Sequence, residues 1–179
     1  MLTELTVRNL ALIETLSLTF GPGVNLMTGE TGAGKSILVG ALGLLTGRRG
    51  GAELVRAGAG EAEVTGLFHL ADPEAFAPLL AEQGLPPADE LLLRRVVTVS
   101  GRGRAYIGGS PVSLAQLARL GEELLSISGQ HEQQSLTRPG RLLDYLDRFG
   151  GHGDLLAEMA AAWAGLDRVA GELAALEES

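Results

Sequence analysis

The chain has 179 residues, of which 45% are apolar, contains no cysteine and carries a formal net charge of −8. These figures exclude an intrinsically disordered chain, a disulfide framework, a thiolate zinc site and a cysteine nucleophile. The negative charge also argues against a protein that wraps nucleic acid over its whole surface, although it leaves room for a local basic patch.

Alternating apolar residues and turn signals predict a first group of elements in the order strand, strand, short buried strand, helix and strand. These elements cover residues 2–8, 14–20, 24–28, 35–46 and 61–70. Glu4 and Arg8 interrupt the start of the chain, where a signal peptide needs an apolar run. The longest apolar run, residues 37–45, is about half of what a membrane-spanning helix requires. We therefore expect a soluble intracellular protein.

A second group of elements follows, with a short helix, a hairpin of two strands, a capped helix, a short strand and a last helix. The short helix begins at Asp72 and the capped helix at Ser113, where Gln116 stands at the spacing of a capping box. The hairpin strands, the short strand and the last helix cover residues 91–100, 105–107, 124–128 and 139–149.

The C-terminal segment has a different pattern, because its apolar residues recur alternately four and three positions apart. The residues are Leu155, Met159, Ala162, Leu166, Val169, Leu173 and Leu176. Such an a/d seam predicts the beginning of a coiled coil, and an amphipathic helix packed on the domain is the alternative. We expect two domains, residues 1–150 and 151–179, and a natural protein that continues beyond the seam.

The glycine-rich loop before the first helix matches the phosphate-binding pattern G-x-x-x-x-G-K-[ST] in full. Its residues are Gly29, Glu30, Thr31, Gly32, Ala33, Gly34, Lys35 and Ser36. The glycines let backbone N–H groups surround phosphate oxygens, Lys35 reaches the β- and γ-phosphates, and the Ser36 hydroxyl binds Mg²⁺. Lys35 is also the only lysine among the fourteen basic residues. The loop therefore predicts a nucleotide site.

ATP is the favoured nucleotide, because a guanine-reading N-K-x-D motif would need a second lysine. Hydrolysis also needs a carboxylate for Mg²⁺ and a group that positions water. No predicted strand contains a run of four apolar residues that ends in Asp or Glu, and no Leu-Ser-Gly-Gly occurs. We thus expect half of an active site, without Walker B, catalytic Glu or signature motif, and inactive alone.

A polar stretch, Ser128–Ser135, forms the second candidate site, because it follows a predicted strand. The Gln130 amide could reach Mg²⁺ or the attacking water, and His131 and Glu132 are candidate acid/base groups. A solvated loop is the alternative for the side chains taken singly. The spacing of His131 and Glu132 matches no zinc site, so zinc is rejected.

Three stretches together resemble the RecN family, SMC-like ATPases of bacterial DNA double-strand-break repair. The stretches are VRNLALIE, TGETGAGKS with the following ILVGALGLLTGRR, and SISGQHEQQSL. The resemblance covers residues 1–150 and implies an α/β fold. That fold is half of a P-loop ABC/SMC-type ATPase head, with an antiparallel β subdomain beside the P-loop core and the start of an antiparallel coiled coil.

The resemblance also implies roles for single residues. Gly29 to Ser36 would be the Walker A loop, and Gln130 the Q-loop glutamine near Mg²⁺ and the attacking water. Arg56 would lie near the nucleotide, and Arg8 and Asn9 would line its base or ribose pocket.

The implied cofactors are ATP and Mg²⁺. The implied partners are DNA, the C-terminal half of the same head, and a second copy that joins through ATP-engaged heads. No membrane is involved, and the location would be the bacterial cytoplasm at the nucleoid. Two alternatives remain open, which are the nucleotide-binding subunit of a transporter and a non-catalytic dimerisation module.

A cluster of arginines on the predicted hairpin is a candidate for DNA phosphate contacts. It comprises Arg94, Arg95, Arg102 and Arg104, and Arg48 and Arg49 follow the first helix. The alternative is a solvated turn, or ion pairs with the surplus acidic residues.

Overall fold

The computed structural model describes residues 1–28, 33–125, 127 and 141–177. Contacts divide the chain into two compact units, Met1–Ile127 and Ser128–Ser179. The first unit carries the sheet and the P-loop helix, and the second is helical in its described part. The domain boundary expected at residue 150 stays a prediction.

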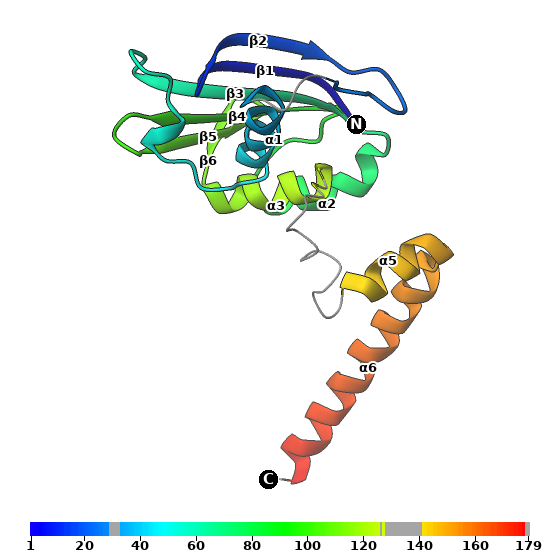
Figure 1. The fold of residues 1–179 in the computed structure, drawn as a ribbon. Coiled ribbons are helices and arrows are strands. Elements are labelled where there is room, and N and C mark those ends of the chain that lie inside the picture. The colour runs from blue at the N-terminus through cyan, green and yellow to red at the C-terminus, as the bar shows by residue number, and fades with distance from the viewer. Residues whose placement is uncertain (29–32, 126, 128–140, 178–179) are drawn as a thin grey trace. The chain divides into compact units, whose positions relative to one another are not determined.

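The first unit is built on a six-stranded antiparallel sheet in the order β2-β1-β3-β4-β5-β6 (Figure 1). The strands are β1 (Leu2–Leu10), β2 (Ile13–Thr19), β3 (Glu61–His69), β4 (Glu90–Thr98), β5 (Gly103–Ile107) and β6 (Ser110–Val112). Five of them confirm predicted strands, with ends shifted by one or two residues. The three-residue edge strand β6 was not predicted, because Pro111 interrupts a strand pattern.

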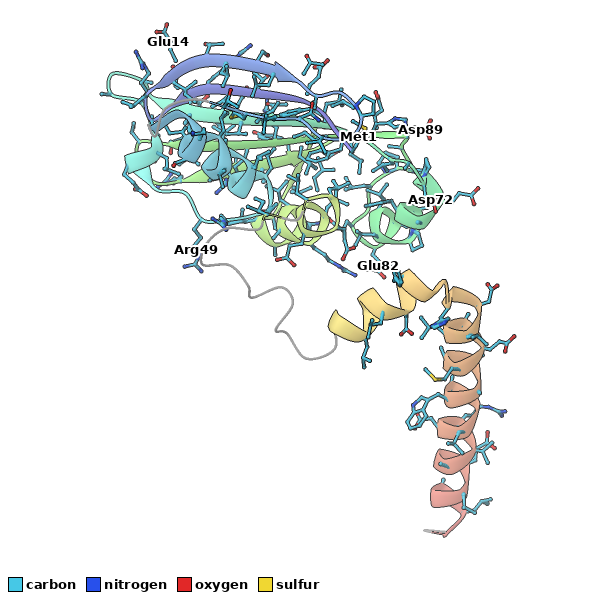
Figure 2. The ribbon with its side chains drawn as sticks, turned by 45° about the vertical axis from the view of Figure 1, so that its right-hand side comes forward. Met1, Glu14, Arg49, Asp72, Glu82 and Asp89 are labelled. Atoms are coloured by element: carbon cyan, nitrogen blue, oxygen red, sulfur yellow. The ribbon has the colours of Figure 1, made fainter. Side chains whose placement is uncertain are left out.

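Helices pack against the sheet and close the core. They are α1 (Ala33–Leu45), α2 (Pro73–Glu82) and α3 (Leu114–Leu124), with a short 3₁₀ turn η1 (Ala52–Leu54). Helix α1 packs on β3 and β4, and α3 packs on β5 and on α1 (Figures 1 and 2). Alternate strand residues form the apolar layer beneath them, including Val7, Val64, Phe68, Leu93 and Ile107. This layer meets Leu44, Leu45, Leu117 and Leu120 from the two helices.

Helix α1 ends in a Schellman motif at Gly47. The Gly47 N–H donates to the Leu44 carbonyl at 3.3 Å, and the Arg48 N–H donates to the Gly43 carbonyl at 3.0 Å. Gly47 has a φ of +81°, a conformation that L side chains rarely adopt. The glycine thus turns the chain sharply and directs the residues that follow.

Helix α3 begins with the predicted capping box. The Ser113 hydroxyl accepts the Gln116 N–H at 3.2 Å, and the Gln116 side-chain oxygen accepts the Ser113 N–H at 2.9 Å. Two backbone donors that the helix cannot satisfy itself are therefore paired.

Replacing Ser113 by alanine should lower the free energy of unfolding by about 1 kcal/mol, because one N-terminal donor of α3 loses its acceptor. Urea denaturation of the Ser113→Ala variant measures this change. Ser110→Ala, an exposed serine in β6, is the matched control and should stay within about 0.5 kcal/mol. Equal effects of the two variants would contradict the assigned role of the cap.

Residues 24–28 are a correction, because they form no strand. Val24 and Leu26 are 95% and 85% exposed, and the Asn25 side chain instead closes a turn by donating to the Gly21 carbonyl at 2.9 Å. The reason is that no strand among the described residues pairs with this segment, and an unpaired strand is unstable in water.

The strand predicted at 124–128 is also wrong at its start. Leu124 is the last residue of α3, where it continues the helical apolar face of Leu117 and Leu120, and Leu125 is extended without strand pairing. Residues 126 and 128 lie outside the described residues.

The second unit contains two helices, α5 (Arg141–Gly150) and α6 (Gly153–Glu177). They confirm the predicted helix at 139–149 in its described part, the break at the glycines and the continuous heptad helix. Gly151 has a φ of +68°, and the His152 N–H donates to the Asp147 carbonyl at 3.0 Å. The six larger seam side chains of α6 are between 54% and 72% exposed. Whether α6 enters a coiled coil stays a prediction.

Candidate nucleotide-binding site

The described part of the phosphate-binding loop forms the first turn of α1. Gly34, Lys35 and Ser36 follow Ala33, the first residue of the helix, whereas Gly29 to Gly32 lie outside the described residues. Lys35 is half-buried and Ser36 is exposed. Since the first four N–H groups of a helix have no partner within it, this turn places backbone donors, an ammonium group and a hydroxyl together.

These groups fit a nucleotide with Mg²⁺ on the chemistry of the donors. A helix N-terminus and a lysine attract phosphate oxygens, and a hydroxyl oxygen is the kind of ligand that Mg²⁺ takes. Within the described ranges, no group of three or more histidine, aspartate or glutamate side chains is placed to hold a metal ion.

Asn9, predicted to line the base or ribose pocket, and Arg56, predicted to lie near the nucleotide, are brought together. The Arg56 N–H donates to the Asn9 carbonyl at 2.9 Å, beside an isolated bridge between Leu10 and Val55. The Arg56 guanidinium donates to the Leu12 carbonyl at 2.8 Å and lies 3.6 Å from the Glu14 carboxylate. Arg56 is therefore fastened to the turn between β1 and β2.

The left-handed backbone of this turn is unusual for non-glycine residues. Asn9 has a φ of 51° and Ala11 a φ of 49°. Asparagine tolerates this conformation, whereas alanine adopts it at a cost of about 1–2 kcal/mol. Arg8, the residue before, is exposed on β1 and faces Thr15 and Glu63 across the two neighbouring strands.

Gln130, His131 and Glu132 lie outside the described residues. Their predicted roles at Mg²⁺ and in acid/base chemistry stay predictions.

The hairpin arginines do not form one patch. Arg94 lies 3.7 Å from the Glu63 carboxylate and 4.2 Å from the centre of the Tyr106 ring, and Arg104 pairs with Glu61. Arg95 is buried on the opposite face of the sheet, because neighbouring strand residues point to opposite sides. Of the four, Arg102 alone is exposed and forms no ion pair with a described residue. The ion-pair alternative therefore holds for Arg94 and Arg104.

Arg95 belongs instead to the helix-covered face of β4, and the prediction of one arginine cluster overlooked this. A signal was available, since Arg95 continues the alternation of Leu91, Leu93 and Val97. Its burial lowers the pKa of the guanidinium from its ordinary value.

Among the helices of the described chain, none has the length and hydropathy needed to cross a membrane.

Comparison with known proteins places these features in a family context. An AAA domain model matches residues 4–70. The DNA repair protein RecN of Vibrio cholerae is 40% identical over 179 residues, which is 100% of this chain and 32% of that protein. The RecN protein of Bacillus subtilis is 43% identical over 152 residues, 84% of this chain and 26% of that protein. The chain thus spans about a third or less of these relatives.

A solved SMC ATPase structure, described for ATP-driven dimerisation and DNA-stimulated activation, is similar with a TM-score of 0.56 and 21% identity. The match covers 81% of this chain and 90% of that one. This likeness assigns the antiparallel sheet and its helices to the α/β fold of P-loop ATPase heads of the SMC type.

Proposed function

Because this chain belongs to the RecN family, we propose that it is the ATP-binding segment of an SMC-like ATPase that acts in recombinational repair of DNA double-strand breaks. The observation that carries this proposal is the Gly-Lys-Ser sequence in the first turn of α1, the helix that packs on the sheet. ATP binding and hydrolysis by the complete protein would control the engagement of two heads and the bridging of DNA.

The proposed site combines described residues and residues outside the described ranges. Gly29 to Lys35 would bind the nucleotide phosphates, and Ser36 with Gln130 would hold Mg²⁺. When bound, Mg²⁺ neutralises phosphate charge. Asn9 and Arg56 lie next to the bridge between Leu10 and Val55 and would contact the nucleotide. Arg8, the neighbour of Asn9 on β1, would add a further contact. ATP is proposed over GTP because the chain has no second lysine.

The proposed partners are inferred from the same family membership. The remaining part of the same head would supply the Walker B carboxylates and the signature motif, and a second copy would join through bound ATP. The exposed apolar residues Val24 and Leu26 and the seam of α6 support the presence of further protein surfaces beside them. We propose the bacterial cytoplasm, at the nucleoid, as the location.

Adding the remaining part of a RecN protein in trans tests this function. ATP turnover should appear and should be lost in Lys35→Ala, which also weakens ATP binding about tenfold or more because a charge-assisted contact to phosphate disappears. GTP should not compete effectively with ATP.

The matched control is Arg119→Ala, which removes an exposed cation of α3 that pairs with Glu82 of α2 and should leave turnover unchanged. A folded and associated pair that shows no turnover would contradict the proposal and favour a dimerisation module. Turnover that survives Lys35→Ala would show that the P-loop is not the catalytic site.

A further inference from the structure

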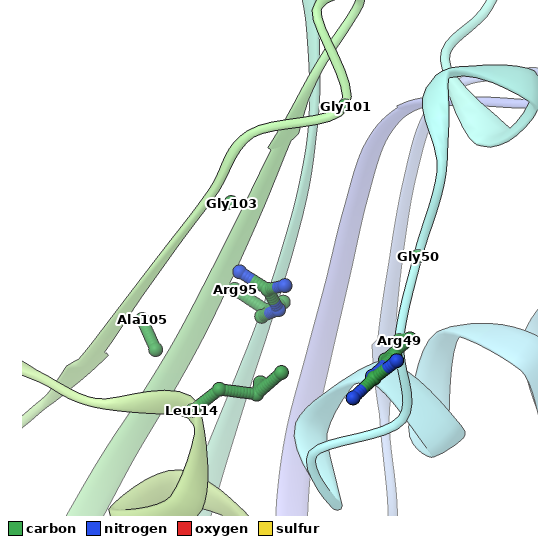
Figure 3. Close-up of a pocket in the computed structure, with 7 residues that line it drawn as sticks. All are labelled: Arg49, Gly50, Arg95, Gly101, Gly103, Ala105 and Leu114. Atoms are coloured by element: carbon green, nitrogen blue, oxygen red, sulfur yellow. The ribbon is translucent and has the colours of Figure 1, made fainter.

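A basic pocket lies on the helix-covered face of the sheet, next to the β4–β5 hairpin (Figure 3). Its volume is about 310 Å³, near the lower limit for small-ligand pockets. Its lining comprises Arg49, Gly50, Arg95, Gly101, Gly103, Ala105 and Leu114. We call it the Arg49–Arg95 pocket. Its lining holds two cations and no acidic residue.

Arg95 is a buried charge without a counter-charge. Its side chain is 5% exposed, in a row of β4 residues otherwise occupied by Leu91, Leu93 and Val97. One guanidinium nitrogen donates to the Val96 and Arg104 carbonyls, each at 3.1 Å. The Nε atom is buried without a hydrogen-bond partner, and no described carboxylate forms an ion pair with Arg95. Burial of an unpaired charge is costly, so an anion in the pocket would offset that cost.

Small residues leave room for the guanidinium. A methyl group at Gly103 would overlap the Arg95 guanidinium, and Ala105 lies directly opposite Arg95 on β5. Gly101, with a φ of +75°, turns the hairpin over the same space. The hairpin sequence therefore accommodates Arg95 in its buried position.

Arg49 brings a second cation to the pocket from the segment that follows α1 (Figure 3). It is exposed and forms no ion pair with a described residue. Leu114, the first residue of α3, lies on the same lining, and the N-terminus of a helix carries partial positive charge. Three sources of positive potential thus converge, which favours an anion with several acceptor oxygens.

The Arg49–Arg95 pocket is separate from the nucleotide site. The phosphate-binding loop precedes the 13-residue helix α1, whereas Arg49 follows its end. At the rise of an α-helix, the two ends of α1 are roughly 20 Å apart. One phosphate group cannot reach both sites.

We propose that the Arg49–Arg95 pocket binds a phosphate group, with Arg95 as the buried anchor and Arg49 as the cation at its entrance. The group is either a free phosphate or a phosphate of a nucleic-acid backbone. Both present the same anionic oxygens to the two guanidinium groups. The other hairpin arginines differ, because Arg94 and Arg104 already pair with Glu63 and Glu61.

Titration with inorganic phosphate, followed by amide NMR, tests the site. The Lys35→Ala variant of the full chain serves as background, so that phosphate binding at the P-loop is weakened and failure of one site is distinguishable from failure of the other. The Gly101 and Gly103 amide signals should shift and saturate. Adding Arg49→Ala should weaken this phosphate binding about tenfold, whereas Arg119→Ala should not change it.

Arg95→Met provides a second variant that preserves the apolar row of β4. It should give a well-dispersed spectrum and no saturable shift at Gly101 or Gly103, because the buried anchor is missing. Saturable binding that persists in folded Arg95→Met, or the absence of any such shift in the Lys35→Ala background, would overturn the proposal.

A short DNA duplex distinguishes the two sources of phosphate. A backbone ligand predicts that Arg49→Ala lowers the slope of log affinity against log salt by about one, and that inorganic phosphate competes with the duplex. A free phosphate ligand predicts saturation by inorganic phosphate and duplex binding, if any, with a slope that does not depend on Arg49. A duplex whose affinity is independent of both Arg49 and Arg95 would refute the backbone form, and the absence of saturation by inorganic phosphate would refute both forms.

Discussion

Replacing Phe68 by alanine should lower the free energy of unfolding of the Met1–Ile127 unit by about 3–5 kcal/mol. Phe68 lies on β3 and is 0% exposed, the largest side chain of the fully buried core. Its ring packs below the helices, close to Gly66, where an added Cβ would lie 3.0 Å from the ring and 2.7 Å from the Leu45 side chain. Truncation removes the transfer free energy of the ring and leaves a cavity that close packing cannot fill.

Native-state hydrogen exchange of β3 and β4 amides is the suitable measurement, because it reports on the sheet itself. Fluorescence would not serve, since the only tryptophan, Trp163, lies in α6 of the second unit. Phe149→Ala is the matched control: this phenylalanine is 94% exposed, and its loss should change sheet protection by less than about 0.5 kcal/mol. A similar loss of protection in both variants would contradict the assigned core.

The antiparallel sheet was predictable because its signals are local. The alternation of Ala62, Val64 and Phe68 in β3 and of Leu91, Leu93 and Val97 in β4 specifies both the strands and the buried face. The capping box at Ser113 likewise lies within four residues. Where neighbouring residues carry the physical cause, the sequence is sufficient.

Residues 24–28 were mispredicted because strand formation depends on a partner that local sequence does not contain. Val24 and Leu26 have the residue types of a buried strand, yet no described strand lies beside them and both are exposed. The apolar pattern indicates that these residues can be buried. Whether they form a strand depends on a partner strand that lies far away in sequence or outside this segment.

The candidate sites differ in the same way, because some are formed by contiguous residues and others by residues from distant elements. Lys35 and Ser36 were placed correctly at the start of a helix because the whole P-loop pattern is contiguous. Arg94 and Arg95 were grouped by proximity in sequence, although strand geometry sends them to opposite faces. The approach of Arg49 to Arg95 joins residues from two distant elements, so no local pattern could have predicted that pocket.

Gly47→Ala should destabilise the same unit by about 2–5 kcal/mol, from two separate causes. The first is backbone strain, since Gly47 has a φ of +81° at the end of α1. The second is overlap with α3, because an added Cβ would clash with the Ala118 side chain and lie 2.6 Å from the Ala118 Cα. A backbone atom cannot move aside as a flexible side chain does, so the two helices would have to separate.

Gly58→Ala isolates the two causes of this destabilisation. Gly58 has a φ of +86° but no atom within 4 Å of an added Cβ, so its variant should cost only about 1–2 kcal/mol of backbone strain. Hydrogen exchange of the β3 and β4 amides during urea denaturation measures the loss in free energy of unfolding of each variant. The difference between the two losses is the cost of the overlap between α1 and α3. Equal losses in the two variants would show that close packing at Ala118 contributes nothing.

Because Gly47 also directs the chain toward Arg49, Gly47→Ala should weaken phosphate binding at the Arg49–Arg95 pocket, whereas Gly58→Ala should leave it unchanged.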